Sequence, residues 1–200
     1  FFDYFQQIKI LKFLKKDIQG KITLFDVGSH HGETVKLFIK KFEIKEVHCF
    51  EASPINFKIL SKEIKKLNFH SNIYLNNVGV GSNNQDTFIN QAEETSSSSI
   101  NEFNKNSKYF KKKLRILNVK NYEKYYKKIP IKLIKLDNYI EKKKIIKIDI
   151  LKIDTEGFEF NVIKGLEKNY NIVKFIYFEH HYDDMIKKNY KFKDINPNFN

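Results

Sequence analysis

Several residue types are scarce in this chain of 200 residues, which has no tryptophan, one cysteine and three prolines. Because Cys49 is the only cysteine, the sequence excludes an intrachain disulfide and a cysteine-based metal site. No apolar run approaches the roughly 18–20 residues that a membrane-spanning helix needs. No segment resembles a secretory signal peptide. We therefore expect a cytoplasmic protein with no transmembrane segment.

Arginine is scarce as well, and acidic residues are outnumbered by basic ones. Lysine and arginine number 37 against 24 acidic residues, which gives a net charge of +13, and Arg115 is the only arginine. A basic protein can bind nucleic acid or another acidic partner. Proteins that bind phosphate, however, favour arginine for its bidentate contacts. We attribute the excess of lysine to a general compositional bias and keep nucleic acid as the alternative partner.

The residues that are present are typical of a globular protein, with 41% hydrophobic and 15% aromatic residues. A chain of this length suits one domain with a well-packed core. The spacing of Leu11, Leu14 and Ile18 predicts an amphipathic helix over residues 1–20. We expect this helix to pack on the domain formed by residues 21–200 rather than on a membrane.

Within residues 21–200, apolar segments rich in β-branched residues alternate with segments of helical spacing. Strands separated by helices predict an α/β, doubly wound fold, with a mostly parallel sheet and helices on both faces. Two short segments, Asp86–Asn90 and Ile131–Leu136, also have strand character. The predicted core strands are Ile22–Val27, Val47–Glu51, Asn72–Val78, Ile148–Asp154 and Val173–Glu179.

Residues 101–129 interrupt this alternation. They are rich in Lys, Asn and Tyr, and they include the most concentrated basic run, Lys108–Arg115. A charge run of this kind is usually a solvated face. We predict a lysine-rich insertion at about 101–129 that contains one or two helical pieces and lies over the functional site.

Acidic residues stand at the ends of four predicted strands, as Asp26, Glu51, Asp154 and Glu179. Because ligands bind at the carboxyl ends of the strands in open α/β sheets, these acids predict a binding site. Glu51 follows Gly28 at about the interval that separates a glycine loop from a ribose-binding acid in nucleotide folds. The simpler alternative for Glu51 is a solvated acid at a strand end.

The glycines of the first loop, Gly28 and Gly32, lack the G-x-G-x-x-G spacing of dinucleotide sites. Gly79–Gly81 forms a second glycine-rich segment, which either allows close backbone approach to a ligand or makes a bend. Asp154 and Glu156 precede a segment of helical spacing. They either belong to the predicted binding site or stabilise that helix by interacting with the dipole at its N-terminus. We favour a site role for both.

Two segments resemble a known superfamily. Asp26–Glu33 reads DVGSHHGE and Phe50–Pro54 reads FEASP. They resemble the glycine loop and the acidic strand end of class I S-adenosylmethionine-dependent methyltransferases. The pair His30-His31 departs from the small or asparagine-containing pair that is usual in that loop.

A more specific resemblance lies in the second half of the chain. Leu151–Glu159 reads LKIDTEGFE and Val162–Gly165 reads VIKG, which is similar to the FkbM family signature, lKiDvEGaE followed by vlkG. Ser96–Ser99 and Leu136–Ile140 fall where that family has a serine patch and an LDdyl segment. The match extends over Ile22–Glu179 apart from the lysine-rich insertion.

The resemblance to the FkbM family implies a Rossmann-like fold with S-adenosylmethionine as the cofactor. It also implies methyl transfer to a hydroxyl of a sugar, a glycan or another small molecule, as in polysaccharide biosynthesis. That acceptor would be the partner of the protein. The chain after Glu179 is too short for the last strands of a class I sheet, so we expect these C-terminal strands to be missing.

The resemblance further implies roles for individual residues. Glu51 would hold the ribose diol, and Asn77 and Val78 would lie beside the adenine. The implied cofactor-binding residues are Asp26, Gly28, Ser29, His30, Gly32, Glu51, Ala52, Asn77 and Val78. The implied catalytic residues are Asp154, Glu156 and His180.

Asp154 and Glu156 would meet the cofactor or the acceptor, and His180 or its neighbour His181 would supply the base. A divalent metal ion is an alternative ligand for these carboxylates, although the spacing is not diagnostic of a metal site.

Three other functions fit parts of the sequence. An RNA ribose methyltransferase suits the net charge of +13. A nicotinamide oxidoreductase would use Glu51, but the glycine spacing argues against it. A nucleotide-binding module without catalysis is the third alternative. Base-amino methylation is not favoured, because it usually needs a turn with paired prolines and Pro54, Pro130 and Pro197 stand apart.

Overall fold

The structure is a computed structural model that describes residues 2–179, 183–188 and 190–195. Its strands are β1 (Ile22–Val27), β2 (Ile44–Phe50), β3 (Asn72–Asn76), β4 (Gly79–Gly81), β5 (Gln85–Ala92), β6 (Tyr126–Lys135), β7 (Ile148–Ile153) and β8 (Val173–Phe178). Its helices are α1 (Phe2–Asp17), α2 (Glu33–Lys41), α3 (Pro54–Lys65), α4 (Lys108–Ile116), α5 (Tyr122–Tyr125), α6 (Leu136–Lys143), α7 (Glu159–Lys164), the short 3-10 helix η1 (Tyr170–Ile172) and α8 (Phe192–Ile195).

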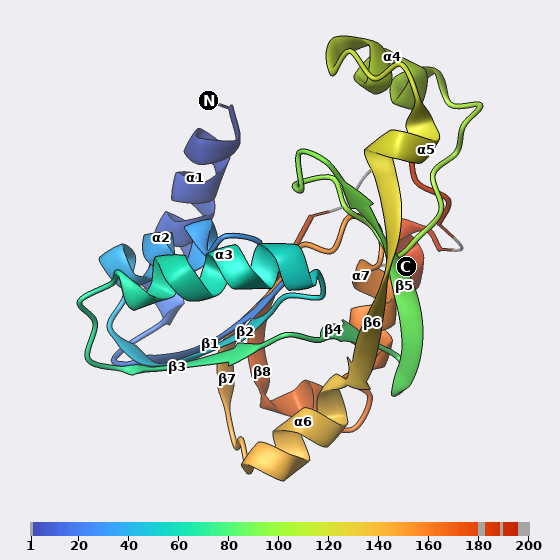
Figure 1. Ribbon diagram of the computed structural model, residues 1–200. Helices are drawn as coiled ribbons and strands as arrows, with labels where there is room; N and C mark the ends of the chain where they lie inside the picture. The colour runs from blue at the N-terminus through green and yellow to red at the C-terminus, as the bar shows by residue number, and fades with distance from the viewer. Residues whose placement is uncertain (1, 180–182, 189, 196–200) are drawn as a thin grey trace.

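The main sheet contains five parallel strands in the order β3-β2-β1-β7-β8 (Figure 1). All six residues of β1 and all six of β7 are buried, as expected for parallel strands that are covered on both faces. The arrangement confirms the predicted doubly wound α/β fold, and the five predicted core strands are all in this sheet.

Alternate residues of the central strands enter two hydrophobic clusters on opposite faces of the sheet. Leu24 packs with residues of α1, α2 and α3 on one face. Phe25 packs with residues of α6 and α7 on the other face. In α1, Leu11 and Leu14 are buried in the first cluster, so this helix packs on its own domain.

A second sheet has the strand order β4-β6-β5, with β4 parallel and β5 antiparallel to β6. It corrects three expectations. Gly79–Gly81 is a strand rather than a turn, because it pairs with β6. Strand β6 begins at Tyr126, inside the segment expected to be the insertion, because its first residues pair with β5. Leu136, expected to end that strand, begins α6.

The lysine-rich segment folds onto the second sheet. Phe110 is the buried residue of α4, and its ring stacks on Phe103 at a centroid distance of 5.2 Å. Tyr125 and Tyr126 complete this aromatic cluster. Helix α4 is therefore amphipathic, with Lys108, Lys111 and Lys112 exposed on the outer side. Among the described helices, none combines the length and the apolar character needed to cross a lipid bilayer.

Candidate active site

The parallel register brings the ends of the central strands side by side. Asp154 N donates to Val27 O at 2.9 Å, and Glu51 N donates to Asn76 O at 3.0 Å. Hydrogen bonding of the sheet thus continues one residue beyond β7 and β2. Glu179 follows β8 in the same way. The carboxylates at separate strand ends therefore meet at one edge of the sheet, where ligands bind in such folds.

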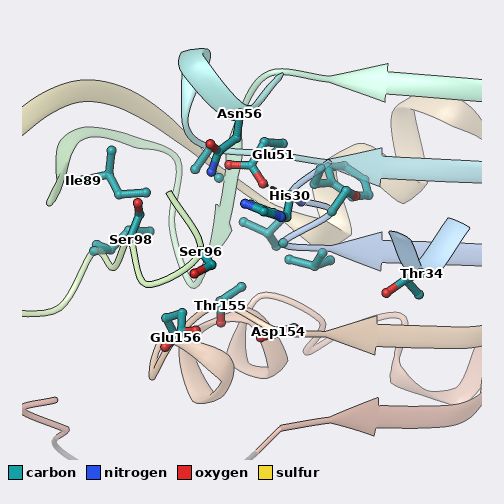
Figure 2. Close-up of a pocket in the computed structure, with 18 of the residues that line it drawn as sticks. His30, Thr34, Glu51, Asn56, Ile89, Ser96, Ser98, Asp154, Thr155 and Glu156 are labelled. Atoms are coloured by element: carbon teal, nitrogen blue, oxygen red, sulfur yellow. Dashed lines mark hydrogen bonds between the residues drawn. The ribbon is translucent and has the colours of Figure 1, made fainter. Parts of the chain in front are cut away.

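A pocket with a volume of about 280 Å³ opens at this edge (Figure 2). This volume is close to the lower end for small-molecule sites, which is roughly 300 Å³. Two walls face each other across the pocket, with Ser96 and Ser98 at one end. We call the side formed by His30, Glu51 and Asn56 the β2 wall. We call the side formed by Asp154, Thr155 and Glu156 the β7 wall.

In the β2 wall, two backbone groups hold the carboxylate of Glu51. His30 N donates to Oε2 at 2.8 Å and Ser53 N donates to Oε1 at 2.9 Å. Ser53 also caps α3, which starts at Pro54, so the local sequence sets this turn. Burial raises the pKa of Glu51 to about 7, although the two backbone hydrogen bonds lower it. The fixed carboxylate retains lone pairs that can accept hydrogen bonds from a ligand.

The glycine loop after β1 is tied to the serine-rich segment. His30 adopts a left-handed conformation with a φ of 46°. Its Nε2 lies 2.9 Å from Oγ1 of Thr95. The ring of His30 also stacks on the ring of His31 at a centroid distance of 3.7 Å. The β2 wall and the end of the pocket are therefore connected by side-chain contacts.

Gly28 joins the two walls. Its φ is 79°, and a Cβ atom at this position would lie 1.8 Å from the carbonyl oxygen of Asp154. The position requires glycine because the loop after β1 packs directly on the turn after β7. This requirement is independent of any ligand.

In the β7 wall, the buried carboxylate of Glu159 stabilises the turn that contains Thr155, Glu156 and Gly157. Glu159 Oε1 accepts hydrogen bonds from Thr155 N at 3.1 Å and from Gly157 N at 2.9 Å. Glu156 has a φ of 51°, which is uncommon for a residue other than glycine. The backbone oxygen of Glu156 accepts a hydrogen bond from Ser99 Oγ at 2.7 Å. The surrounding structure thus maintains an unfavourable conformation that points to a functional role.

Glu156 has a strongly shifted acidity. Burial and, to a smaller extent, the nearby Asp154 raise its pKa to about 8, although Lys113 lowers it. Such a carboxyl group can take up or release a proton near neutral pH. Helix α7 begins at Glu159, so Asp154 and Glu156 precede its first turn. Among these acids, only Glu159 lies in the first turn of α7, where a negative charge interacts favourably with the helix dipole.

The sequence interpretation overlooked Lys152, which is 7% exposed. Its Nζ lies 3.3 Å from Asp26 Oδ1 and 3.3 Å from Asp154 Oδ2, and it donates to Gly28 O at 3.2 Å. Burial lowers the pKa of Lys152, but the two carboxylates raise it above its ordinary value. A lysine within an apolar strand signals a buried charge that needs partners, and this signal could have identified it.

The predicted cofactor-binding residues fall into two groups. Those that line the pocket are Gly28, Ser29, His30, Glu51 and Ala52. Those that do not line it are Asp26, Gly32, Asn77 and Val78.

Asp26 lies fully buried beside Lys152, and burial raises its pKa while Lys152 lowers it. Asn77 supports the β2 wall, because its Nδ2 donates to Glu51 O at 2.9 Å. Of the predicted catalytic residues, Asp154 and Glu156 line the pocket, and His180 lies outside the described residues.

The expected cover of the site is also corrected. Among the described residues that line the pocket, none belongs to 101–129. The helices of that segment pack on the second sheet instead, and Thr95, Ser96 and Ser98 line the pocket. Asn56 and Thr95 were missed as site residues, because only the folded chain brings them next to the glycine loop.

A parallel sheet with a glycine loop after β1, an acid after β2 and carboxylates after β7 defines a Rossmann-like α/β protein with a ligand site at its strand ends. The sequence matches the Methyltransferase FkbM domain over residues 26–199. The chain therefore belongs to the FkbM methyltransferase family.

Among curated proteins, none matches the sequence significantly. Among solved structures, the chain is similar to the methyltransferase FkbM from Methylobacillus flagellatus KT, with 18% sequence identity and a TM-score of 0.47. The similar region covers 76% of this chain and 31% of that chain. The chain therefore spans less than a third of the length of that protein.

Proposed function

We propose that this chain is an S-adenosylmethionine-dependent O-methyltransferase that acts on a hydroxyl of a sugar, a glycan or another small molecule. One observation carries the proposal. In a chain of the FkbM methyltransferase family, the glycine loop, Glu51 and the Asp154–Glu156 turn line a single pocket. A role in polysaccharide biosynthesis follows from this acceptor class.

The residues of the β2 wall fit the cofactor. Glu51 is 5% exposed, and its two oxygens are fixed by backbone donors, so it can accept hydrogen bonds from a ribose diol without reorganisation. Ser29, His30 and Ala52 would complete the contacts to the nucleoside end. Asn77 would act through Glu51, whose backbone oxygen it holds at 2.9 Å.

The residues of the β7 wall fit the transfer step. When bound, S-adenosylmethionine would supply a methyl group on its sulfonium sulfur, and in-line attack by the acceptor oxygen on the methyl carbon would release the thioether S-adenosylhomocysteine. Asp154, next to the buried ammonium of Lys152, would bind the amino group of the cofactor. Glu156, with a pKa raised to about 8 by burial, would take the proton of the acceptor hydroxyl. Positioning of the acceptor against the methyl group supplies much of the remaining rate.

The first experiment compares ligands by thermal shift. We expect S-adenosylhomocysteine, the product form of the cofactor, to raise the melting temperature, and NAD to have no effect. Glu51→Ala and Asp154→Ala should remove the shift, whereas Glu46→Ala, on strand β2, which precedes Glu51, and outside the pocket, should retain it. Stabilisation by NAD alone would contradict the proposed cofactor.

The second experiment identifies the acceptor. The chain is incubated with methyl-labelled S-adenosylmethionine and either total RNA or a glycan extract. We expect label in the glycan extract. Label in RNA would replace the proposed acceptor by ribose, an outcome that the net charge of +13 makes worth testing. Cofactor binding without transfer to either extract would favour the binding module.

A further inference from the structure

A cluster of metal-ligating side chains stands on the glycine loop. The Nδ1 atoms of His30 and His31 lie 3.5 Å and 3.9 Å, respectively, from the same carboxylate oxygen, Glu33 Oε1. One ligand atom of each residue lies within 4.8 Å of the other two. His30 and Glu33 also line the pocket, so an ion bound here would form part of its wall.

Contacts to the other polar atoms of His30 and Glu33 orient these two side chains. His30 Nε2 lies 2.9 Å from Thr95 Oγ1, which can accept a hydrogen bond from Nε2–H and so leave the Nδ1 lone pair free. Glu33 Oε2 accepts a hydrogen bond from His31 N at 3.2 Å, which leaves Oε1 toward the two rings. Metal-binding histidines typically donate their other ring N–H to an oxygen in this way.

His31 also has a polar neighbour, Asn56, that can orient its ring. Its Nε2 is buried and forms no hydrogen bond within the described chain, and the same is true of Asn56 Oδ1. The Asn56 carboxamide faces the His31 imidazole. A hydrogen bond between these two atoms would fix the tautomer that presents Nδ1 to Glu33.

The donor set selects the class of ion. Two imidazole nitrogens and one carboxylate oxygen suit zinc, cobalt or nickel rather than magnesium or calcium, which prefer oxygen ligands. Zinc lies about 2.0–2.1 Å from such atoms in a tetrahedral site, which places ligand atoms about 3.3 Å apart. The observed 3.5 Å and 3.9 Å are close to this spacing, and all three ligand atoms lie within 4.8 Å of one another.

Two features of the cluster oppose metal binding. The imidazole rings stack at 17°, so one ring must tilt before both lone pairs converge on an ion. The N-terminus of α2 disfavours a cation, but Glu33 in its first turn offsets that dipole. The common alternative for such a cluster is Glu33 paired with a protonated histidine.

We infer that His30, His31 and Glu33 bind a divalent transition-metal ion of the zinc class, with water as the fourth ligand. The site does not depend on the proposed function, because it is defined by the free protein and its ligand is the metal alone.

The test is a titration of chelator-treated protein with ZnCl2 by calorimetry and with CoCl2 by visible absorption. We expect one ion per chain and a tetrahedral Co2+ spectrum. His30→Asn, His31→Ala and Glu33→Gln should each weaken binding by at least about tenfold, in the range seen for lost ligands and their supports. Asn at position 30 tolerates the positive φ, and the Glu33 side chain is 64% exposed, so neither change should unfold the protein.

Two controls make the result specific. His70→Ala removes an exposed histidine from another part of the domain and should leave binding unchanged. The double variant His180→Ala/His181→Ala removes the second adjacent pair of histidines in the sequence and should also have no effect. Equal affinity in wild type and Glu33→Gln, or loss of binding only in the His180/His181 variant, would overturn the site.

Discussion

The two walls of the pocket are built differently. In the β2 wall, backbone N–H groups hold Glu51, and the carboxylate needs no side-chain cation to stay in place. In the β7 wall, Asp154 relies on the buried Lys152, and Glu156 stands in an unfavourable backbone conformation. The β2 wall therefore fixes its carboxylate with backbone groups alone, whereas the β7 wall depends on a buried cation and on a constrained backbone.

Because the two walls are built differently, substitutions of their carboxylates should have different effects. Changes at Glu51 in the β2 wall should act on cofactor affinity. In the β7 wall, changes at Glu156 should act on the transfer step, and changes to the Lys152–Asp154 pair should act on stability and on cofactor affinity. The predictions below test that division, starting with the largest expected effect.

Lys152→Met should lower the free energy of unfolding by about 3–5 kcal/mol, because it leaves the buried Asp26 and its neighbour Asp154 without their shared cation. Urea unfolding measures this loss. The control Lys187→Met breaks an exposed ion pair with Glu102 and should change the free energy of unfolding far less. A loss below about 1 kcal/mol for Lys152→Met would mean that Asp26 is protonated in the folded chain and needs no cation.

Glu156→Gln should lower kcat by about 10²–10⁴-fold, because the amide cannot take the proton of the acceptor. Affinity for S-adenosylhomocysteine, measured by calorimetry, should stay nearly the same. Glu179→Gln changes another acid that lines the pocket, and we expect a much smaller loss of rate. Equal losses in the two variants would place the base elsewhere.

Glu51→Gln should weaken binding of S-adenosylhomocysteine by about 1.5–3 kcal/mol, the usual contribution of hydrogen bonds to a charged group. At saturating cofactor, kcat should change less than in Glu156→Gln. Glu46→Gln serves as the matched control on β2, because Glu46 bonds to Thr23 and does not line the pocket. The division between the walls fails if Glu51→Gln changes kcat and leaves affinity intact.

The acidity of Glu156 should also affect stability. Its pKa in the folded chain, about 8, lies above the ordinary value of 4.5, so the folded state binds the proton more tightly than the unfolded state. Stability should therefore fall as the pH rises from about 5 to 8. We expect a loss on the order of 1 kcal/mol, because solvent in the pocket screens part of the shift.

Urea unfolding of wild type and Glu156→Gln at pH 5 and pH 8 isolates this contribution. The variant should lose less stability than wild type over the interval. Parallel losses in both proteins would show that Glu156 keeps an ordinary pKa in solution.

Much of the fold was predictable, because local patterns carry it. The β-branched runs of β1 and β7 predicted buried strands, and both strands are fully buried. The boundary of the insertion was not predictable in the same way. Strand β6 begins at Tyr126 because residues up to Ala92 on β5 pair with it, and this pairing lies outside any local window.

The acids of the candidate site were predictable from the sequence, but the residues that hold these acids in place were less so. Glu51, Asp154 and Glu156 were identified from their places after predicted strands and from the family signature, and all three line the pocket. Lys152 was missed because its role depends on a partner on another strand. The role of Asp26 was also incomplete without the register that sets it opposite Lys152.

The sequence by itself determined which segments form the core strands, which acids follow them, and membership of the FkbM methyltransferase family. Apolar periodicity and short motifs are properties of contiguous residues, so they can be recognised in the sequence alone. Only the tertiary structure decided which carboxylates are bound by backbone groups, which share a buried cation, and which histidines gather around Glu33. Burial and partnership depend on residues far apart in the chain, and these determine the charge and the acidity of each group.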